Sequence, residues 1–428
     1  MVTTAFVNIF GKRVGAVAWD SNRGLASFEY DPKFDIKQFP IAPIKMPNKN
    51  KVYSFPEFRE SETFKGMPGL LADALPDRYG KELINAWLAR QGRPDNSLNP
   101  VELLCFIGKR GMGALEFEPI ISKETPSYDL ELSDLVETTK ALLERKQDLN
   151  ITTKNKMEDV MMDVLKMGTS AGGARPKAII AYNETTGKIK SGQTLAEGGF
   201  EHWLIKFDEI SDVQFGSSSG YGRVEMAYYK MATDFCIEMM ESRLIEENNR
   251  AHFMTKRFDR MGGNQKIHVQ TLCALQHYDF ANITSYSYEQ VFQTMRQLRL
   301  SYAEAEQMFK RMVFNVIARN CDDHTKNFSF MMDAQGKWKL APAYDICFAY
   351  RPDSLWVSQH NLSISGKRKD FRRADLIAIA EQNSIRNPER IIEQALELMK
   401  DWHKYAEMYQ VGKSLTKQID GDLIKEMK

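Results

Sequence analysis

The stretch that decides the fold runs from Val313 to Ile346 and reads VFNVIARNCDDHTKNFSFMMDAQGKWKLAPAYDI. Apolar residues recur at helical spacing in its first turns, which predicts a helix with one buried face. The residues after Asn320 are too polar for a core, and two short alternating segments on either side of Asp333–Gly336 predict a half-buried hairpin. The sequence thus predicts a helix, a polar loop, a hairpin and, directly after the hairpin, Asp345.

This order of elements is the one that protein kinases use for phosphoryl transfer. In those enzymes a loop aspartate orients the attacking hydroxyl, an asparagine five residues later holds magnesium, and an aspartate beyond the hairpin holds magnesium as well. Here Asp322 and Asn327 are five residues apart and Asp345 follows the hairpin. Magnesium prefers such oxygen ligands. The alternative is an acidic surface loop whose residues cap helices and turns, and this stretch alone favours neither interpretation.

Composition limits the class of protein. The chain has 428 residues, 43% of them hydrophobic and 27% charged, which is ordinary for a soluble globular protein of two or three domains. A formal net charge of +1 gives no overall attraction to nucleic acid. The five cysteines are scattered without a CxxC pair, which indicates reduced thiols. No apolar run approaches a membrane span and no signal segment is recognisable, so we expect a cytoplasmic protein without a membrane partner.

The N-terminal residues predict three short antiparallel strands at 5–9, 14–19 and 25–30, joined by Gly-containing and Asn-containing turns. A proline-rich connection follows. A helix is expected from about Asp77 to Gly92 and another over 99–106. Elementary physical chemistry assigns the stretch from 64 to 92 only a packing role.

A glycine-rich turn, Gly168 to Lys177 (GTSAGGARPK), precedes a strand over 178–182. Such a turn can offer backbone N–H groups to phosphate oxygens, although it lacks the spacing of a Walker loop and can equally be a plain tight turn. Ser170 adds a second possibility. A phosphate on its hydroxyl would place about two negative charges where the phosphates of a nucleotide must lie and would repel them.

Lys206 is a single charge in the apolar strand HWLIKF. A lysine there either extends its amino group from a strand end or contacts phosphate, paired with a glutamate of the next helix. The helix expected over 221–240 carries Glu225 in its first turns, where an acidic residue also suits a helix N-terminus. The strand expected over 251–259 stands where a kinase has the strand that runs into its interlobe hinge. In that case backbone groups of 255–258 would meet adenine, with Phe258 as an apolar wall.

Beyond this point the chain predicts helices over 289–299, 301–318, 374–381 and 388–407. Between them lies a basic run, Gly366 to Arg373. A solvated helix start explains it, and a contact with DNA phosphates is the alternative.

With these motifs laid out, the chain resembles the HipA family, the serine/threonine kinase toxins of bacterial toxin–antitoxin pairs. Six motifs occur in the order of the family and extend over nearly the whole length. They are KGMPGLLADALPDRYG within 64–80, SAGGARPK at 170–177, HWLIKF at 202–207 with VEMAYYKMA from 224, KRFDR at 256–260, CDDHTKNFSF at 321–330 and APAYDI at 341–346.

The resemblance implies an α+β, two-lobed protein-kinase-like fold. A β-rich N-terminal HipA-type module would span 1–125, a mixed nucleotide-binding N-lobe 126–258, and a mostly helical catalytic C-lobe 259–428. Asp322 would be the catalytic base, Asn327 and Asp345 the magnesium ligands and Ser170 the site of autophosphorylation. The implied ATP-binding residues are Lys206, Lys177, Gly172, Gly173, Ala174, Lys256, Phe258, His324, Lys326 and Glu225.

The resemblance also implies partners: a HipB-like helix-turn-helix antitoxin, operator DNA reached through that complex, and a phosphorylated component of the translation machinery, an aminoacyl-tRNA synthetase in family members. Two residues depart from the expected pattern. Asp323 stands where a small residue is expected and would alter loop flexibility or recruit metal. Lys256 stands where an acidic hinge residue is expected, which leaves only backbone recognition of the nucleotide there.

Two other hypotheses remain open from the sequence. The first is a small-molecule or lipid kinase on the same fold, because the Asp–Asn–Asp pattern does not distinguish its hydroxyl substrate from serine. The second is an inactive kinase-like subunit that completes a repressor complex on DNA, with Lys367, Arg368 and Lys369 as its phosphate contacts.

Overall fold

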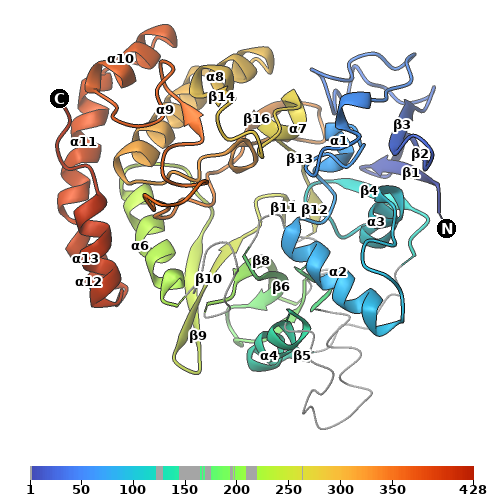
Figure 1. The fold of residues 1–428 in the computed structure, drawn as a ribbon, viewed down its shortest axis with the longest axis horizontal. Helices are drawn as coiled ribbons and strands as arrows, with labels where there is room; N and C mark the ends of the chain where they lie inside the picture. The colour runs from blue at the N-terminus through green and yellow to red at the C-terminus, as the bar shows by residue number, and fades with distance from the viewer. Residues whose placement is uncertain are drawn as a thin grey trace.

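The computed structural model describes residues 2–121, 129–143, 164–165, 167–168, 175–192, 196, 198–208, 219–262 and 264–428. An N-terminal β-sheet, a central six-stranded sheet and a mainly helical C-terminal part follow one another along the chain (Figure 1). The predicted boundaries of the three parts, 1–125, 126–258 and 259–428, stay a prediction.

The N-terminal sheet has the strand order β3-β2-β1-β4. Its strands are β1 Thr4–Ile9, β2 Lys12–Asp20, β3 Leu25–Tyr30 and β4 Leu115–Glu118. The three predicted strands are confirmed, and each neighbouring pair is antiparallel. Strand β4 was not expected, because its four residues come from a distant part of the chain and pair with β1 only in the folded state.

Short helices follow this sheet. They are η1 Pro56–Phe58, α1 Gly69–Ala72, α2 Arg78–Arg90 and α3 Pro100–Ile107. Helix α2 begins where the sequence places it, because the Asp77 side chain accepts a hydrogen bond of 2.7 Å from the backbone N–H of Gly80. At Gly69 an added Cβ would lie 2.4 Å from the carbonyl oxygen of Ala274, so glycine allows α1 to approach the C-terminal part closely.

The central sheet has the order β5-β7-β6-β8-β10-β9 and is antiparallel throughout. Its strands are β5 Asp129–Leu130, β6 Lys177–Asn183, β7 Ile189–Ser191, β8 Phe200–Lys206, β9 Ser242–Glu247 and β10 Arg250–Lys256. Helices α4, Leu132–Leu143, and α6, Tyr221–Asp234, belong to this part. The register pairs Lys177 of β6 directly with Lys206 of β8, so the two lysines share one end of the sheet.

Helix α6 ends six residues before the predicted boundary at Met240. The backbone N–H of Ile237 donates to the carbonyl oxygen of Ala232 at 2.9 Å, and Cys236 adopts a left-handed φ of 60°. This is a Schellman termination in which cysteine occupies the position that glycine usually takes. The sequence therefore carried no glycine signal for the end of the helix.

The C-terminal part contains small sheets among helices. Its strands are β11 Arg260–Met261, β12 Gln265–Lys266, β13 His268–Thr271, β14 Tyr286–Ser287, β15 Ser329–Met332, β16 Trp338–Leu340 and β17 Leu362–Ser363. Its helices are α7 Leu272–Gln276, α8 Tyr288–Gln297, α9 Tyr302–Ile317, η2 Thr325–Asn327, α10 Arg373–Gln382, α11 Pro388–Lys400, α12 Trp402–Met408 and α13 Lys413–Asp422.

Two expectations for this part were wrong in detail. The helix expected over 388–407 is interrupted at Asp401, which separates α11 from α12. The hairpin β15–β16 is present, but all four residues of β15 are buried rather than alternately exposed. Strand β15 lies between β13 and β16, so both its edges are paired.

One large apolar core joins the N-terminal sheet to the C-terminal helices and includes residues as distant as Val7, Phe314 and Trp402. A second core lies between the central sheet and helices α2 and α4, with Leu83 and Trp203 fully buried in it. Helix α2 therefore packs against the central sheet although it belongs to the N-terminal residues (Figure 1).

The segment that follows strand β10 is fixed to the N-terminal part by a buried cluster of charges. The guanidinium of Arg257 donates to both carboxylate oxygens of Asp259, at 2.8 and 2.6 Å, and Arg260 donates to the same carboxylate at 2.6 Å. The backbone N–H of Gly113 adds a bond of 2.7 Å, and both arginines donate to the carbonyl oxygen of Gly111. Burial alone would raise the pKa of Asp259, but the two arginines hold it below its ordinary value.

We expect Asp259→Asn to lower the free energy of unfolding by about 3–5 kcal/mol, because two buried arginines lose their counter-charge. The unfolded-state pKa of an aspartate is about 3.9, so the contribution of this carboxylate is present above that pH and lost as the pH falls toward the lower folded-state value. Thermal unfolding of wild type and variant at neutral and acidic pH measures this difference.

Asp353→Asn is the matched control, because the Asp353 side chain is 82% exposed and such a surface ion pair contributes at most about 1 kcal/mol. Equal unfolding temperatures for Asp259→Asn and the wild type at neutral pH would contradict the role assigned to the cluster.

Candidate active site

The loop after helix α9 positions Asp322. The backbone N–H of Cys321 donates to the carbonyl oxygen of Ala349 at 3.0 Å, and the backbone N–H of Ala349 donates to the carbonyl oxygen of Arg319 at 3.0 Å. The loop is therefore paired with the segment that follows Asp345. The side-chain amide of Asn327 donates to the carbonyl oxygen of Asp322 at 2.7 Å. This hydrogen bond uses the nitrogen of the amide and not its Oδ1, the atom that a metal ion would need.

The next residue, Asp323, is a buried anchor for this loop. Its carboxylate accepts hydrogen bonds from the Tyr288 hydroxyl at 2.8 Å, from the backbone N–H of Asn361 at 2.7 Å and from Nδ1 of His360 at 2.9 Å. Burial alone would lower the pKa of His360, but the Asp323 carboxylate raises it to about 10. The departure at position 323 therefore fixes the loop, and both oxygens of its carboxylate are engaged within the chain rather than turned toward a metal.

Lys206 lies between two carboxylates that come from different elements. Its Nζ is 2.5 Å from Oε1 of Glu225 on α6 and also contacts Oδ1 of Asp345. Helix α6 reaches this position because Gly222 packs on β10, where an added Cβ would lie 1.9 Å from the carbonyl oxygen of Ala251. Three residues that are far apart in the sequence thus meet at one point.

Asp345 adopts a left-handed φ of 53°, a backbone conformation that is strained for residues other than glycine. Burial alone would raise its pKa, but the ammonium groups of Lys206 and Lys177 lower it to about 2. The carboxylate is therefore an anion at any physiological pH.

Asp322 lies close enough to interact with Asp345. Burial raises the pKa of Asp322, the charges of His324 and Arg175 lower it, and the charge of Asp345 raises it again, with a net upward shift. Nε2 of His324 is 3.9 Å from the Asp322 carboxylate. The side-chain amide of Asn320, two residues before Asp322, donates to the carbonyl oxygen of Asp345 at 3.3 Å. Two residues that are 23 positions apart in the sequence are therefore held in adjoining segments.

Lys177 joins this group from β6. Its side chain is 3% exposed, and its Nζ is 3.7 Å from Oδ2 of Asp77, the residue that caps helix α2. Burial lowers the pKa of Lys177, whereas the carboxylates of Asp77 and Asp345 raise it. The positive charge of Lys177 lowers the pKa of Asp77, but burial has the larger effect and raises this pKa to about 6. The N-terminal residues thus contribute a carboxylate next to the candidate site.

Of the two predicted hinge residues, Phe258 packs on the residue before Asp345, whereas Lys256 pairs with carboxylates elsewhere. The ring of Phe258 stacks on Tyr344, with the centroids 5.7 Å apart. The ammonium of Lys256 instead pairs with Glu201 at 2.8 Å and with Glu241 at 2.7 Å. A nucleotide contact at position 256 would therefore have to come from the backbone.

His324 and Lys326 both pack on Phe280. The ring of His324 is 5.3 Å from that of Phe280, and the ammonium of Lys326 is 4.7 Å from its centroid. The backbone carbonyl of Lys326 accepts a hydrogen bond from the Tyr344 hydroxyl at 2.7 Å. The loop and the segment before Asp345 are thereby connected.

The predicted residues Ser170, Gly172, Gly173 and Ala174 lie outside the described residues. The last part of their motif is described. The guanidinium of Arg175 lies 4.6 Å from the ring centroid of Tyr221, at the start of α6.

The predicted DNA contacts differ in how they are used inside the chain. Lys367 pairs with Asp375 at 2.8 Å. Arg368 donates to the backbone carbonyl of Tyr286 at 3.0 Å and also to that of Asn361. Lys369 is exposed.

Four side chains that act at or near the site were not predicted from the sequence. They are Asp77 beside Lys177, Asp73, Arg175 and His360. Asp73 accepts hydrogen bonds from the backbone N–H and the hydroxyl of Thr271, at 2.7 and 2.8 Å. Arg175 could have been found, because it stands in the glycine-rich motif next to Lys177. The other three act on partners so distant in the sequence that no local pattern marks them.

Comparison with known families identifies the family of this chain. The family described as the HipA N-terminal domain matches residues 5–118, and the HipA-like C-terminal domain matches residues 169–403. The chain belongs to the HipA family. The resemblance drawn from the six motifs is confirmed.

A solved structure of HipA has the same fold as this chain. The HipA of Shewanella oneidensis MR-1, from a complex with HipB and operator DNA, matches with a TM-score of 0.66 at 17% sequence identity, over 98% of this chain and 96% of that one. The expected α+β, protein-kinase-like fold is therefore confirmed. The proinflammatory kinase CtkA of Helicobacter pylori covers 59% of this chain at a TM-score of 0.36 and 12% identity, over 86% of its own length.

A curated relative from Sinorhizobium fredii carries the name "Putative kinase Y4mE" and is 30% identical over 110 residues. The match spans 23% of this HipA-family chain and about a quarter, 26%, of that protein. Within the part of this chain that the structure describes, no helix combines the length and the apolar character needed to cross a membrane.

We expect His360→Gln to lower the free energy of unfolding by about 3–5 kcal/mol, because Asp323 stays buried without its cation. The folded-state pKa of His360 lies above the unfolded value of about 6.5, so the stabilisation is complete below that pH. It should be lost as the pH rises from about 6.5 toward 10. Denaturant unfolding of both proteins across this range measures the difference.

His403→Gln serves as the control, since the His403 side chain is 65% exposed where it approaches Asp420. A stability difference for His360→Gln that stays constant from pH 6 to pH 10 would show that the pair is not an ion pair.

Proposed function

We propose that the chain is a HipA-type toxin that acts as an ATP- and magnesium-dependent serine/threonine protein kinase. The observation that carries the proposal is the position of Lys206 between Glu225 and Asp345, with the Asp322 carboxylate close to Asp345. Kinases use a lysine–glutamate pair, a loop aspartate and a metal-binding aspartate in this combination. Family membership supports the same function.

The donor set fits a magnesium ion. Asp345 would supply an ionised carboxylate. Asn327 would supply its amide oxygen, since its hydrogen bond to Asp322 uses the amide nitrogen. Both would hold the ion, which neutralises charge on the phosphates of ATP when it is bound. Lys206 would contact phosphate oxygens while Glu225 keeps its ammonium in place. Lys177 brings a second positive charge to the same end of the sheet.

Asp322 would orient the substrate hydroxyl and accept its proton. Its raised pKa makes the carboxylate a better proton acceptor than an exposed aspartate. The buried hydrogen bonds of Asp323 fix the backbone next to Asp322. The side-chain amide of Asn327 donates to the carbonyl oxygen of Asp322. Catalysis of this kind depends on position, so the rigid loop serves the reaction directly.

We further propose that the kinase modifies its own Ser170 and is inhibited as a result. The described end of the same motif carries Arg175 and Lys177. A phosphate on Ser170 would add about two negative charges next to these cations and compete with the phosphates of ATP.

The proposed partners follow from membership of the HipA family. The related Shewanella HipA was solved with HipB and operator DNA. We propose that a HipB-like helix-turn-helix antitoxin neutralises this chain and brings it to its operator. Its substrate is proposed to be a component of the translation machinery, an aminoacyl-tRNA synthetase first of all. Lys367 and Lys369 are both exposed, but Lys367 is paired with Asp375, so Lys369 is the lysine of the basic run best placed for a direct DNA contact.

Asp322→Asn is expected to reduce phosphate transfer by about 10²- to 10⁴-fold, because it removes the proton acceptor and leaves the shape of the side chain unchanged. Incubation of the purified protein with labelled ATP and magnesium, with and without serine-containing peptides, measures the transfer. Asp353→Asn should retain wild-type activity, because this carboxylate is 82% exposed and its ion pair is with the half-exposed Arg351.

Equal incorporation of label by the wild type and Asp322→Asn would refute the assignment of the base. Label that appears only in metabolites or lipids would favour the small-molecule kinase. Normal operator repression with antitoxin but no transfer to any acceptor would favour the inactive repressor subunit.

Mass spectrometry after incubation with ATP is expected to find phosphate on Ser170 in the wild type and none in Asp322→Asn. Ser170→Asp, which imitates part of the added charge, should bind ATP at least about tenfold more weakly than the neutral Ser170→Asn. Unchanged ATP affinity in Ser170→Asp would contradict inhibition by charge.

A further inference from the structure

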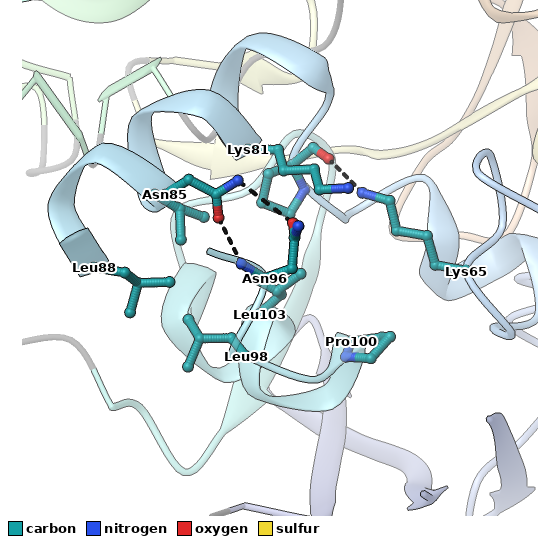
Figure 2. A pocket seen from close by; sticks show the side chains of 10 residues that line it. Lys65, Lys81, Asn85, Leu88, Asn96, Leu98, Pro100 and Leu103 are labelled. Carbon is teal, nitrogen blue, oxygen red and sulfur yellow. Dashed lines mark hydrogen bonds between the residues drawn. The ribbon is translucent and has the colours of Figure 1, made fainter. Parts of the chain in front are cut away.

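A small pocket lined by Pro76, the residue before Asp77, has no role in the proposed chemistry. Its volume is about 150 Å³, and it lies between helix α2 and the segment that leads into α3. Figure 2 shows aliphatic side chains on one side of it and the amino groups of Lys65 and Lys81 at the other. The aliphatic lining comes from Ile84, Leu88, Leu98 and Leu103.

The lysines at this pocket are held close together. The Nζ of Lys65 donates to the carbonyl oxygen of Pro76 at 3.3 Å, and Lys81 approaches Glu62 at 3.8 Å. The Glu62 side chain is 88% exposed, so it screens this charge weakly. Burial lowers the pKa of Lys65 to about 8, and the charges of Lys81 and Lys326 contribute to this lowering. Mutual repulsion of this kind is relieved when an anion binds between the cations.

Pro76 connects the pocket to the candidate site. It lines the pocket and directly precedes Asp77, whose Oδ2 lies 3.7 Å from Nζ of Lys177. Lys177 pairs in register with Lys206, which contacts Asp345. The pocket and the candidate site thus adjoin the same end of the central sheet, where one bound protein segment would meet both.

The shape and lining of the pocket limit its occupant. Asn85 and Asn96 bond to each other, through the Asn96 backbone N–H at 2.9 Å and the side-chain amide of Asn85 at 3.4 Å, so they close one wall (Figure 2). The other described residues that line it are mainly aliphatic and include no aromatic ring of the kind on which single-stranded nucleic acid stacks. A protein segment with one aliphatic side chain and a neighbouring carboxylate fits this lining. The aliphatic side chain would pack on the apolar wall, and the carboxylate would pair with the lysines.

We propose that this pocket is a docking subsite for the protein substrate, which places an acidic side chain on Lys65 and Lys81 and a neighbouring aliphatic side chain against Leu88 and Leu98. The subsite rests on the proposed kinase function and adds a substrate class to it. It selects serine or threonine segments that are accompanied by an acidic–aliphatic pair.

A set of synthetic peptides tests the subsite. Each contains one serine, and a Glu-Leu pair is moved along the positions on either side of it, with Lys-Leu and Glu-Gly pairs as controls. The wild type should phosphorylate one Glu-Leu register with a kcat/KM about tenfold above that of the matching Lys-Leu peptide. Equal values for the two series at every register would overturn the subsite while leaving the kinase function intact.

Charge reversal provides the sharper comparison. The double variant Lys65→Glu, Lys81→Glu should reverse the preference, so that the Lys-Leu peptide becomes the better substrate and the KM for peptide changes more than the KM for ATP. Lys413→Gln, an exposed lysine at the start of α13, is the matched control and should keep the wild-type preference. A preference that survives charge reversal would overturn the proposal.

Binding of a fluorescent Glu-Leu peptide, followed by anisotropy, separates the subsite from catalysis. If no variant transfers phosphate but the wild type binds this peptide more tightly than the charge-reversed protein, the kinase proposal fails and the pocket is still a site for an acidic segment. Tighter Lys65-dependent binding of a single-stranded RNA oligonucleotide than of the peptide would overturn the assignment to a protein substrate.

Discussion

The structure depends above all on the requirement that a buried ammonium be matched by carboxylates. Lys206 meets Glu225 and Asp345, which belong to a helix and to a loop far from its strand in the sequence. A buried charge without partners costs several kcal/mol, so the helix, the strand and the loop must come together for any of them to be stable in this form. The geometry that the proposed phosphate site needs is thereby a consequence of folding.

Much of the fold could be predicted from local patterns. Alternation marked the first three strands, and the cap at Asp77 marked the start of α2. The errors occurred where local signals are silent. Cys236 ends a helix in a conformation usually given to glycine, and β15 is buried because β13 pairs with its second edge. Neither the termination nor the pairing can be read from the residues alone.

The candidate site divides in the same way. Asp322 and Asn327 are close in sequence, so their spacing and residue types alone make phosphoryl transfer one of two reasonable interpretations of the loop. Lys206 and Asp345 gain their assigned roles mainly because motifs of a known family occur in order. The partners that fix the loop, such as His360 for Asp323, come from segments with no recognisable motif and are identified only in three dimensions.

The arginines beside Asp259 have a consequence for how this protein can diverge. They donate hydrogen bonds to the main-chain carbonyl oxygens of Gly111 and Gly113, and every amino acid has such an oxygen. Most residues of that loop can therefore be substituted during evolution without loss of these hydrogen bonds. Gly113 is the exception, since its left-handed φ of 77° and the nitrogen of Val269, 3.1 Å from an added Cβ, leave little room for any other residue.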